Sequence, residues 1–206
     1  MLKTIVADCD VMSFVLVHMR LQAEVEIVLR QCDRGLVTLD SVYRREAQSS
    51  LRETIDKLVA GGLCERVEHA KARTLDKKQK KLFQQIVHLA EKHHRLTSDN
   101  DRGLLFEAQV RGALLFTEDG PLKRLAADRG QATFGAIDFV ALLHELGHLD
   151  EKRRAHLLAP LSARTGHPVD EATLQRLGAA LKLACAESGQ ATPEAEAPDR
   201  NPGEGA

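Results

Sequence analysis

Aromatic side chains are scarce in this sequence. It has no tryptophan and one tyrosine, and aromatic residues make up 3% of its 206 residues. Proteins that hold single-stranded nucleic acids by base stacking rely on exposed aromatic side chains. The composition therefore argues against stacking as the main way in which this chain recognises a ligand.

Neither disulfides nor membrane-spanning segments are indicated. Cysteines stand at positions 9, 32, 64 and 185 without a C-x-x-C pair, and a chain of this length can bury a core without cross-links. The apolar run at residues 4–7 is too short for a signal peptide, and no later run approaches membrane-spanning length. We expect a soluble protein with free thiols in a reducing cytoplasm and no membrane partner.

A large net charge is also missing, but the acids are unevenly distributed. The formal charge is −1, and residues 186–206 carry five acids, one base, three of the six prolines and no large hydrophobic residue. Such a segment cannot bury enough apolar surface to offset its ordering entropy, so we expect a disordered acidic tail. The remaining chain, at +3, favours a local basic groove over a broadly basic surface.

Short apolar runs alternate with amphipathic stretches along the rest of the chain. This alternation predicts parallel β-α-β units, and hence a three-layer α/β/α sandwich around a mostly parallel sheet. We expect one domain over residues 1–150 and a C-terminal helical extension over 151–185 that packs on it. The predicted strands are 3–10, 35–41, 63–69, 113–120 and 131–136, and the predicted helices are 11–34, 42–62, 75–94, 98–112, 121–130 and those within 137–185.

Four acids from four segments are expected at one edge of this sheet. In an open parallel sheet, ligands bind beyond the carboxyl ends of the strands. Carboxylates that converge there would repel one another, and Mg²⁺ or Mn²⁺, which prefers carboxylate oxygen and water, would relieve that repulsion. The four acids are Asp8, Glu46, Asp101 and Asp119.

Each acid also has an ordinary structural explanation. Asp10 and Asp101 could cap helices, and Glu46 could be an exposed helix charge. Asp119 could be a turn residue before Gly120. For any single acid the structural explanation is the commoner one, but their joint placement at one edge favours a site.

The order of these acids resembles that of the PIN-domain nucleases, in particular the VapC-type toxin ribonucleases. Asp8-Cys9-Asp10 in "IVADCDVMSFVL" matches the D-x-[N/S/D] that ends the first strand of that family. The next strand and helix, "LVTLDSVYRREA", put Glu46 in the register of the family's inward glutamate. The resemblance spans about residues 3–150.

The second half of the resemblance is a helix-opening acid followed by a T-x-D strand end. In "DRGLLFEAQVRGALLFTED" these are Asp101, Thr117 and Asp119, and the two acids are 18 positions apart. The sequence departs from the family at Asp10, where asparagine or serine is commoner. It departs again at Glu118, which stands beside Asp119 and leaves two candidates for the last acid.

The resemblance implies metal-dependent hydrolysis of phosphodiester bonds, usually in RNA. Asp8, Asp101 and Asp119 would hold one or two Mg²⁺ or Mn²⁺ ions, and Glu46 would bind metal or orient the attacking water. Family members often form homodimers and are often silenced by an antitoxin protein. The expected auxiliary groups are Asp10, Thr117 and Glu118.

Basic residues close to the acids are candidates for contacts with the RNA backbone. The lysines within 77–81 are interpreted as a solvated helix face. The alternative to a nuclease is a non-catalytic PIN-like module that binds RNA or a protein. The candidate RNA-binding residues are Arg44, Arg45, Arg102, Lys123 and Arg124.

Residues 144–148, "HELGH", match the H-E-x-x-H string of zinc peptidases, the third alternative. That motif needs both histidines on one continuous helix, whereas Gly147 and Asp150 indicate a helix end and a new start. Glu151 and Arg154 occupy the places where a metzincin has its glycine and third histidine. We interpret the string as a coincidence. The residues then expected to face the core are Leu142, Leu143 and Leu146.

Overall fold

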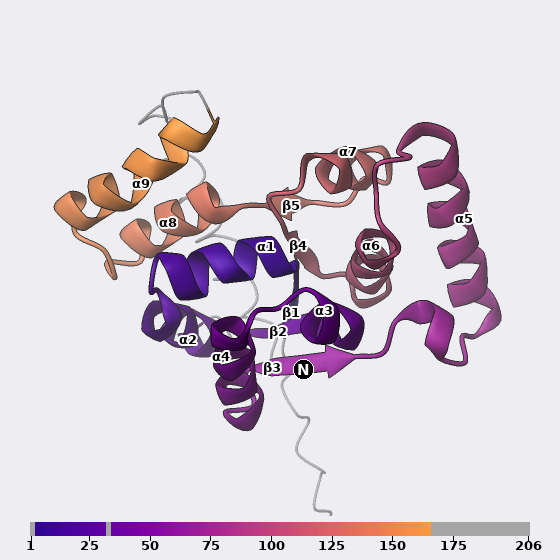
Figure 1. The fold of residues 1–206 in the computed structure, drawn as a ribbon, viewed down its shortest axis with the longest axis horizontal. Coiled ribbons are helices and arrows are strands. Elements are labelled where there is room, and N and C mark those ends of the chain that lie inside the picture. Colours follow the sequence, from indigo (N-terminus) through magenta and orange to yellow (C-terminus); the bar gives the residue numbers. More distant parts are fainter. Residues whose placement is uncertain (1–2, 32–33, 166–206) are drawn as a thin grey trace, which may run out of the picture.

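A computed structural model describes residues 3–31 and 34–165 (Figure 1). Its five strands form one sheet in the order β3-β2-β1-β4-β5, and every neighbouring pair is parallel. All five strands lie where the sequence predicts them. They are β1 Lys3–Ala7, β2 Arg34–Leu39, β3 Cys64–Val67, β4 Leu114–Phe116 and β5 Thr133–Phe134.

Helices cover both faces of the sheet, which confirms the predicted three-layer α/β/α sandwich. One layer contains α1, η1, α2 and α8, and the other contains α6 with α5 and α7 packed against it (Figure 1). The helices of the first half are α1 Cys9–Met12, the π-helix η1 Ser13–His18, α2 Gln22–Gln31, α3 Asp40–Arg45, α4 Ser49–Ala60 and the 3₁₀ turn η2 Ala70–Ala72. Those of the second half are α5 Lys77–His93, α6 Asp99–Arg111, α7 Gly120–Asp128, α8 Ala136–Glu145 and α9 Glu151–Thr165.

The strands are apolar on both sides because both faces are covered. Successive side chains of a strand point to opposite faces. Ile5 and Leu114 therefore face the layer of α2 and α8, whereas Val6 and Leu115 face the other layer and are fully buried. This explains why the strands appear in the sequence as continuous apolar runs.

Two helices predicted as continuous are interrupted. The helix expected over 11–34 breaks before α2, where Arg20 adopts a left-handed conformation with φ of 54°. The helix expected over 42–62 breaks between α3 and α4, because Gln48 is extended (φ −72°, ψ 165°). This second break leaves Glu46 as the residue that ends α3, instead of an interior position on a long helix.

The last described helix, α9, packs against α8 (Figure 1). Its Leu157 and Leu158 are buried in the main core. The rest of the predicted extension, as far as residue 185, and the predicted tail at 186–206 lie outside the described residues. None of the helices that the structure describes is long and apolar enough to cross a membrane.

Candidate active site

Asp8 lies at the carboxyl end of β1, beside the end of β4. Its backbone N–H donates to the carbonyl of Phe116 (2.9 Å), and its Oδ2 accepts from Oγ1 of Thr117 (2.9 Å). Thr117 is fully buried and Asp8 is 6% exposed. Beyond β1 the chain moves outward to β2 and β3, and β4 and β5 lie on the opposite side. Asp8 therefore occupies the point where the strand order reverses, the usual ligand position in such sheets.

Burial raises the pKa of Asp8 to about 7. The hydrogen bond from Thr117 opposes this shift, whereas the nearby carboxylates of Asp101 and Asp10 increase it. Asp10 is exposed in the first turn of α1. The carboxyl group of Asp8 is therefore held in a place that disfavours its charged form.

Asp101 lies in the first turn of α6, where it forms a reciprocal cap with Ser98. Its Oδ2 accepts from the backbone N–H of Ser98 (2.5 Å), and its own N–H donates to the hydroxyl of Ser98 (3.1 Å). Ser98 is thus the N-cap, and Asp101 is its partner three residues on. Burial raises the pKa of Asp101, and the carboxylate of Asp119 raises it further.

Asp119 follows β4 and is the N-cap of α7. Its Oδ1 accepts from the N–H of Leu122 (2.6 Å), and its own N–H donates to the hydroxyl of Thr117 (3.1 Å). The hydroxyl of Thr117 therefore links the two residues: it accepts from the backbone N–H of Asp119 and donates to the carboxylate of Asp8. Asp101 is close enough to Asp8 to raise its pKa, and Asp119 is close enough to Asp101 to raise the pKa of Asp101.

Glu118 is separate from this group. Its carboxylate accepts from the N–H of Ala136 (2.6 Å), the first residue of α8, and pairs with Lys123 (2.7 Å). A side chain at Gly135 would collide with it. Of the two adjacent acids, Asp119 thus faces the group of carboxylates, and Glu118 caps a helix.

Glu46 is held by Asn100, a residue that the sequence did not point to, and Asn100 is held in turn by Ser41. Oε1 of Glu46 accepts from Nδ2 of Asn100, and Oδ1 of Asn100 accepts from the hydroxyl of Ser41 (2.7 Å). Burial raises the pKa of the Cys9 thiol. Glu46 is close enough to Cys9 to raise that pKa further. The only signal for Asn100 in the sequence is its place next to Asp101.

In the present arrangement, no three histidine, cysteine, aspartate or glutamate side chains of the described residues lie close enough together to coordinate one ion. Asp101 and Asp119 each accept from a backbone N–H at a helix N-terminus, and Glu46 accepts from Asn100. The donor chemistry still fits a hard divalent cation. Buried carboxylates with raised pKa values gain most from a cation that prefers oxygen ligands.

A groove of about 430 Å³ opens next to Glu46, beside Ser41 and Asn100. Two of the expected RNA-binding residues line it: Arg44, which pairs with Asp40 (2.6 Å), and Arg45. Lys71 and His69, which the sequence did not single out, line it as well.

The other expected basic residues do not line this groove. Arg102 is largely buried and pairs with Asp99 (3.5 Å), and Lys123 pairs with Glu118. Arg124 lies against Gly120 at the start of α7. On α5, the lysines within 77–81 are exposed, as expected for a solvated face.

The H-E-x-x-H string is divided by a helix end. The helix α8 stops at Glu145, and Gly147 has a φ of 78°. His144 contacts the carbonyl of Leu149 (3.0 Å), whereas His148 contacts Gln31 (2.9 Å). The two histidines therefore do not share a continuous helix. Leu142 and Leu143 are buried and Leu146 packs against the core, as predicted.

No known family model and no curated protein matches this sequence. Among solved structures, the chain is similar to one in the crystal structure of VapBC2 from Rickettsia felis bound to a DNA fragment from their promoter. The identity is 10% and the TM-score 0.46, and the likeness covers 64% of this chain and 98% of that chain. A likeness this distant carries no argument about function, so the fold assignment depends on the sheet and its two helical layers.

Proposed function

We propose that this chain is a divalent-metal-dependent ribonuclease of the PIN-like type. The observation that carries the proposal is the environment of Asp8. This carboxyl group is buried at the reversal of the strand order, its pKa is raised to about 7, and Asp101 lies close by. Strongly shifted acids in such a position are typical of functional sites.

In this proposal Asp8, Asp101 and Asp119 would hold Mg²⁺ or Mn²⁺, and Glu46 would orient the attacking water. A bound ion would lower the pKa of that water and stabilise charge on the phosphate oxygens. The chain itself fixes Asp8 through Thr117. Arg44, Arg45 and Lys71, which line the neighbouring groove, would bind backbone phosphates of the RNA.

Replacement of Asp8 tests the proposal. Asp8→Asn keeps the volume and the hydrogen bond from Thr117 but removes the charge. We expect Mn²⁺-dependent cleavage of RNA by the purified protein to fall about 100-fold or more, the scale seen when a charge-stabilising group is lost. Asp76→Asn, at the cap of α5, is the matched control and should cleave like the parent, because asparagine caps as well as aspartate. Equal cleavage by the Asp8 variant would remove this residue from the site.

A non-catalytic PIN-like module that binds RNA or a protein is the competing function. The caps formed by Asp101 and Asp119 favour it, because these side chains already have structural roles. The two functions differ in one measurement: a binding module retains RNA without metal-dependent cleavage, in the parent and in Asp8→Asn alike.

If the chain is the toxin of a toxin–antitoxin pair, its partner is a small antitoxin protein that blocks the site. A small protein encoded beside its gene should then inhibit RNA cleavage at a molar ratio near one. A homodimer is also proposed, and light scattering of the purified chain tests it directly.

A further inference from the structure

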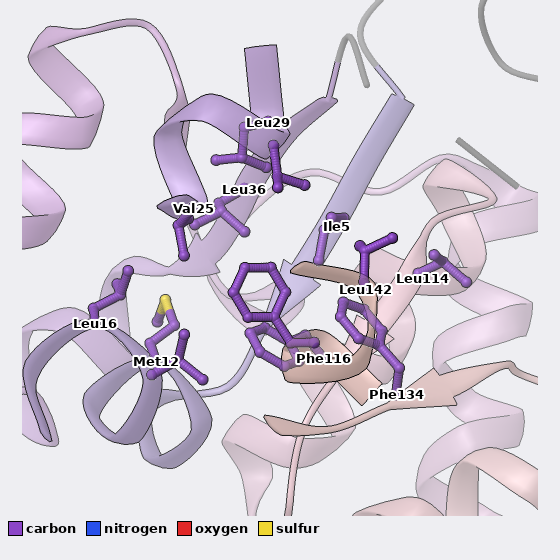
Figure 2. A pocket seen from close by; sticks show the side chains of 13 residues that line it. Ile5, Met12, Leu16, Val25, Leu29, Leu36, Leu114, Phe116, Phe134 and Leu142 are labelled. Carbon is purple, nitrogen blue, oxygen red and sulfur yellow. The ribbon is translucent and has the colours of Figure 1, made fainter. Parts of the chain in front are cut away.

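An apolar hollow and the groove beside Glu46 differ in size and chemistry. The hollow lies between the sheet and the layer of α2 and α8 (Figure 2), and its volume of about 40 Å³ is lined by apolar side chains such as Ile5 and Leu142. A polar ligand gains nothing in a space without polar partners. The groove has a volume of about 430 Å³, within the roughly 300–1,000 Å³ of pockets that hold small molecules.

The groove is formed by three segments that side-chain contacts hold together. Ser41 of α3 donates to Asn100 of α6 (2.7 Å). His69, which precedes η2, contacts the carbonyl of Asp99 through Nε2 (2.8 Å) and accepts from the N–H of Lys71 through Nδ1 (3.1 Å). The groove is therefore pre-formed, which reduces the entropy that is lost when a ligand binds.

The groove is lined by as many carboxylates as cations. Carboxylates repel phosphate, so a groove for phosphate alone would not need them. A neutral group that offers N–H donors fits them instead, and in RNA that group is a nucleobase. The cations are Arg44, Arg45 and Lys71, and the carboxylates are Asp40, Glu68 and Asp99.

Two of the three carboxylates are already paired. Asp40 pairs with Arg44 (2.6 Å), and Asp99 pairs with Lys71 (2.7 Å). Among the residues that the structure describes, Glu68 has no hydrogen-bond or ion-pair partner. An ionised carboxylate only accepts hydrogen bonds, and both oxygens of Glu68 are available. Glu68 is therefore the carboxylate of the groove that can receive N–H groups from a ligand.

We propose that the groove binds an unpaired guanine of the RNA and that Glu68 recognises it. Guanine presents N1–H and N2–H side by side on one edge, which matches the two oxygens of a carboxylate, and the other three bases present no such pair. In a duplex these donors are used in base pairing, so the guanine lies in a single-stranded segment. Recognition by hydrogen bonds also agrees with the scarcity of aromatic side chains.

Asn100 joins the groove to the proposed catalytic residues. It lines the groove, and its amide nitrogen donates to Glu46. The guanine therefore belongs to a nucleotide next to the scissile phosphate. This placement rests on the proposed function, whereas binding of the base itself does not require cleavage.

Binding of nucleoside 5′-monophosphates to the metal-free protein tests the proposal without cleavage. The amide NMR signals of Glu68, His69 and Lys71 report on the groove, and differences between the nucleotides report on the base. Guanosine monophosphate should bind at least about fivefold more tightly than the adenosine, cytidine, uridine or inosine compound, of which the last lacks only the N2 amino group. Equal affinities, or the same shifts with inorganic phosphate, would overturn the proposal.

Glu68→Gln replaces one acceptor oxygen with an N–H donor at almost the same size. The affinity for guanosine monophosphate should fall to that for inosine monophosphate. Glu53→Gln, at an exposed glutamate of α4 that does not line the groove, is the matched control and should bind like the parent. Both glutamates are exposed, so both variants should keep the Tm of the parent. A guanine preference that survives in Glu68→Gln would contradict the assignment.

Cleavage of RNA with Mn²⁺ separates this proposal from the proposed function. A single-stranded RNA with one guanine should be cut next to it, and inosine in its place should lower kcat/KM at least about fivefold. Cleavage without a base preference would contradict the guanine site and leave the nuclease standing. Selective binding of guanosine monophosphate without cleavage of any RNA would support the guanine site and contradict the nuclease.

Discussion

The carboxyl group of Asp8 makes the stability of the folded protein depend on pH. Its pKa is about 7 in the folded state and near 3.8 ordinarily, so the folded protein keeps this proton to a higher pH than the unfolded chain does. The free energy of unfolding should therefore be largest below about pH 4 for this group and fall as pH rises to about 7, by up to about 4 kcal/mol.

Urea unfolding between about pH 4 and pH 8, with a chelator present, measures this fall. Asp8→Asn carries no titrating group at the position and should show a shallower fall than the parent. Asp76→Asn, far from the site, should keep the slope of the parent. An identical slope for Asp8→Asn would mean that this carboxyl group does not titrate as its burial predicts.

Asn100 should affect catalysis through Glu46. An ionised carboxylate only accepts hydrogen bonds, so the amide nitrogen of Asn100 faces Glu46 and its oxygen accepts from Ser41. Asn100→Ala removes both contacts. We expect kcat for RNA cleavage to fall about 10-fold or more, with a smaller change in KM, as for other residues that orient a reacting group.

Gln109→Ala is the matched control for this prediction. Gln109 is another side-chain amide of α6, and it bonds Arg129 at the far end of the helix. It should lose stability without losing kcat. Equal kcat values for both variants would show that Asn100 only joins two helices.

At the scale of secondary structure, the start of α8 depends on a carboxylate from the loop after β4. Glu118 accepts from the first N–H of α8, and Gly135 leaves the space that this approach needs. Gly135→Ala should displace Glu118 and lower the free energy of unfolding by about 1–3 kcal/mol, the cost of a buried group left without its partner.

Thermal or urea unfolding of Gly135→Ala and Gly61→Ala provides the comparison. Gly61 ends α4 with a negative φ (−80°), and a methyl group there meets only ordinary contacts, so its variant should be as stable as the parent or slightly more so. If Gly135→Ala matched Gly61→Ala, the cap formed by Glu118 would not be needed.

At the scale of the whole molecule, metal and mutation should have opposite effects on Tm. The carboxylates of Asp8, Asp101 and Asp119 repel one another without a cation, and Asp101→Asn removes one of these charges. The metal-free variant should melt higher than the metal-free parent but gain less from Mn²⁺. For the parent, an ion that binds only the folded state adds about 2.7 kcal/mol at a hundredfold excess over Kd.

Melts of the parent and Asp101→Asn, each with chelator and with Mn²⁺, decide the matter. Asparagine can still accept from Ser98, so the cap itself should survive the change. Equal shifts with Mn²⁺ in both proteins would contradict a metal site that includes Asp101, and would leave the binding module as the better function.

Some of this arrangement follows from local sequence, and some depends on contacts between distant segments. The positions of Asp8 and Asp119 were predictable, because each follows an apolar run and parallel strands end at one edge. The contact between Ser41 and Asn100 was not, because it joins residues 59 positions apart across two helices. The choice between Glu118 and Asp119 also depended on where α8 begins. The break after Glu46 was missed because the helical spacing of apolar residues continues through it.

The hydrogen bond between Thr117 and Asp8 joins residues 109 positions apart in the chain. A ribosome that adds about 5–20 residues per second therefore takes about 5–20 s to make Thr117 after Asp8. During this interval the nascent chain carries Asp8 but not β4, the strand that pairs with β1 in the folded protein. Glu118 and Asp119 have not yet been made either. Under the proposed function, a chain that ends before β4 lacks Asp119 and the partner strand of β1, so it should not cleave RNA.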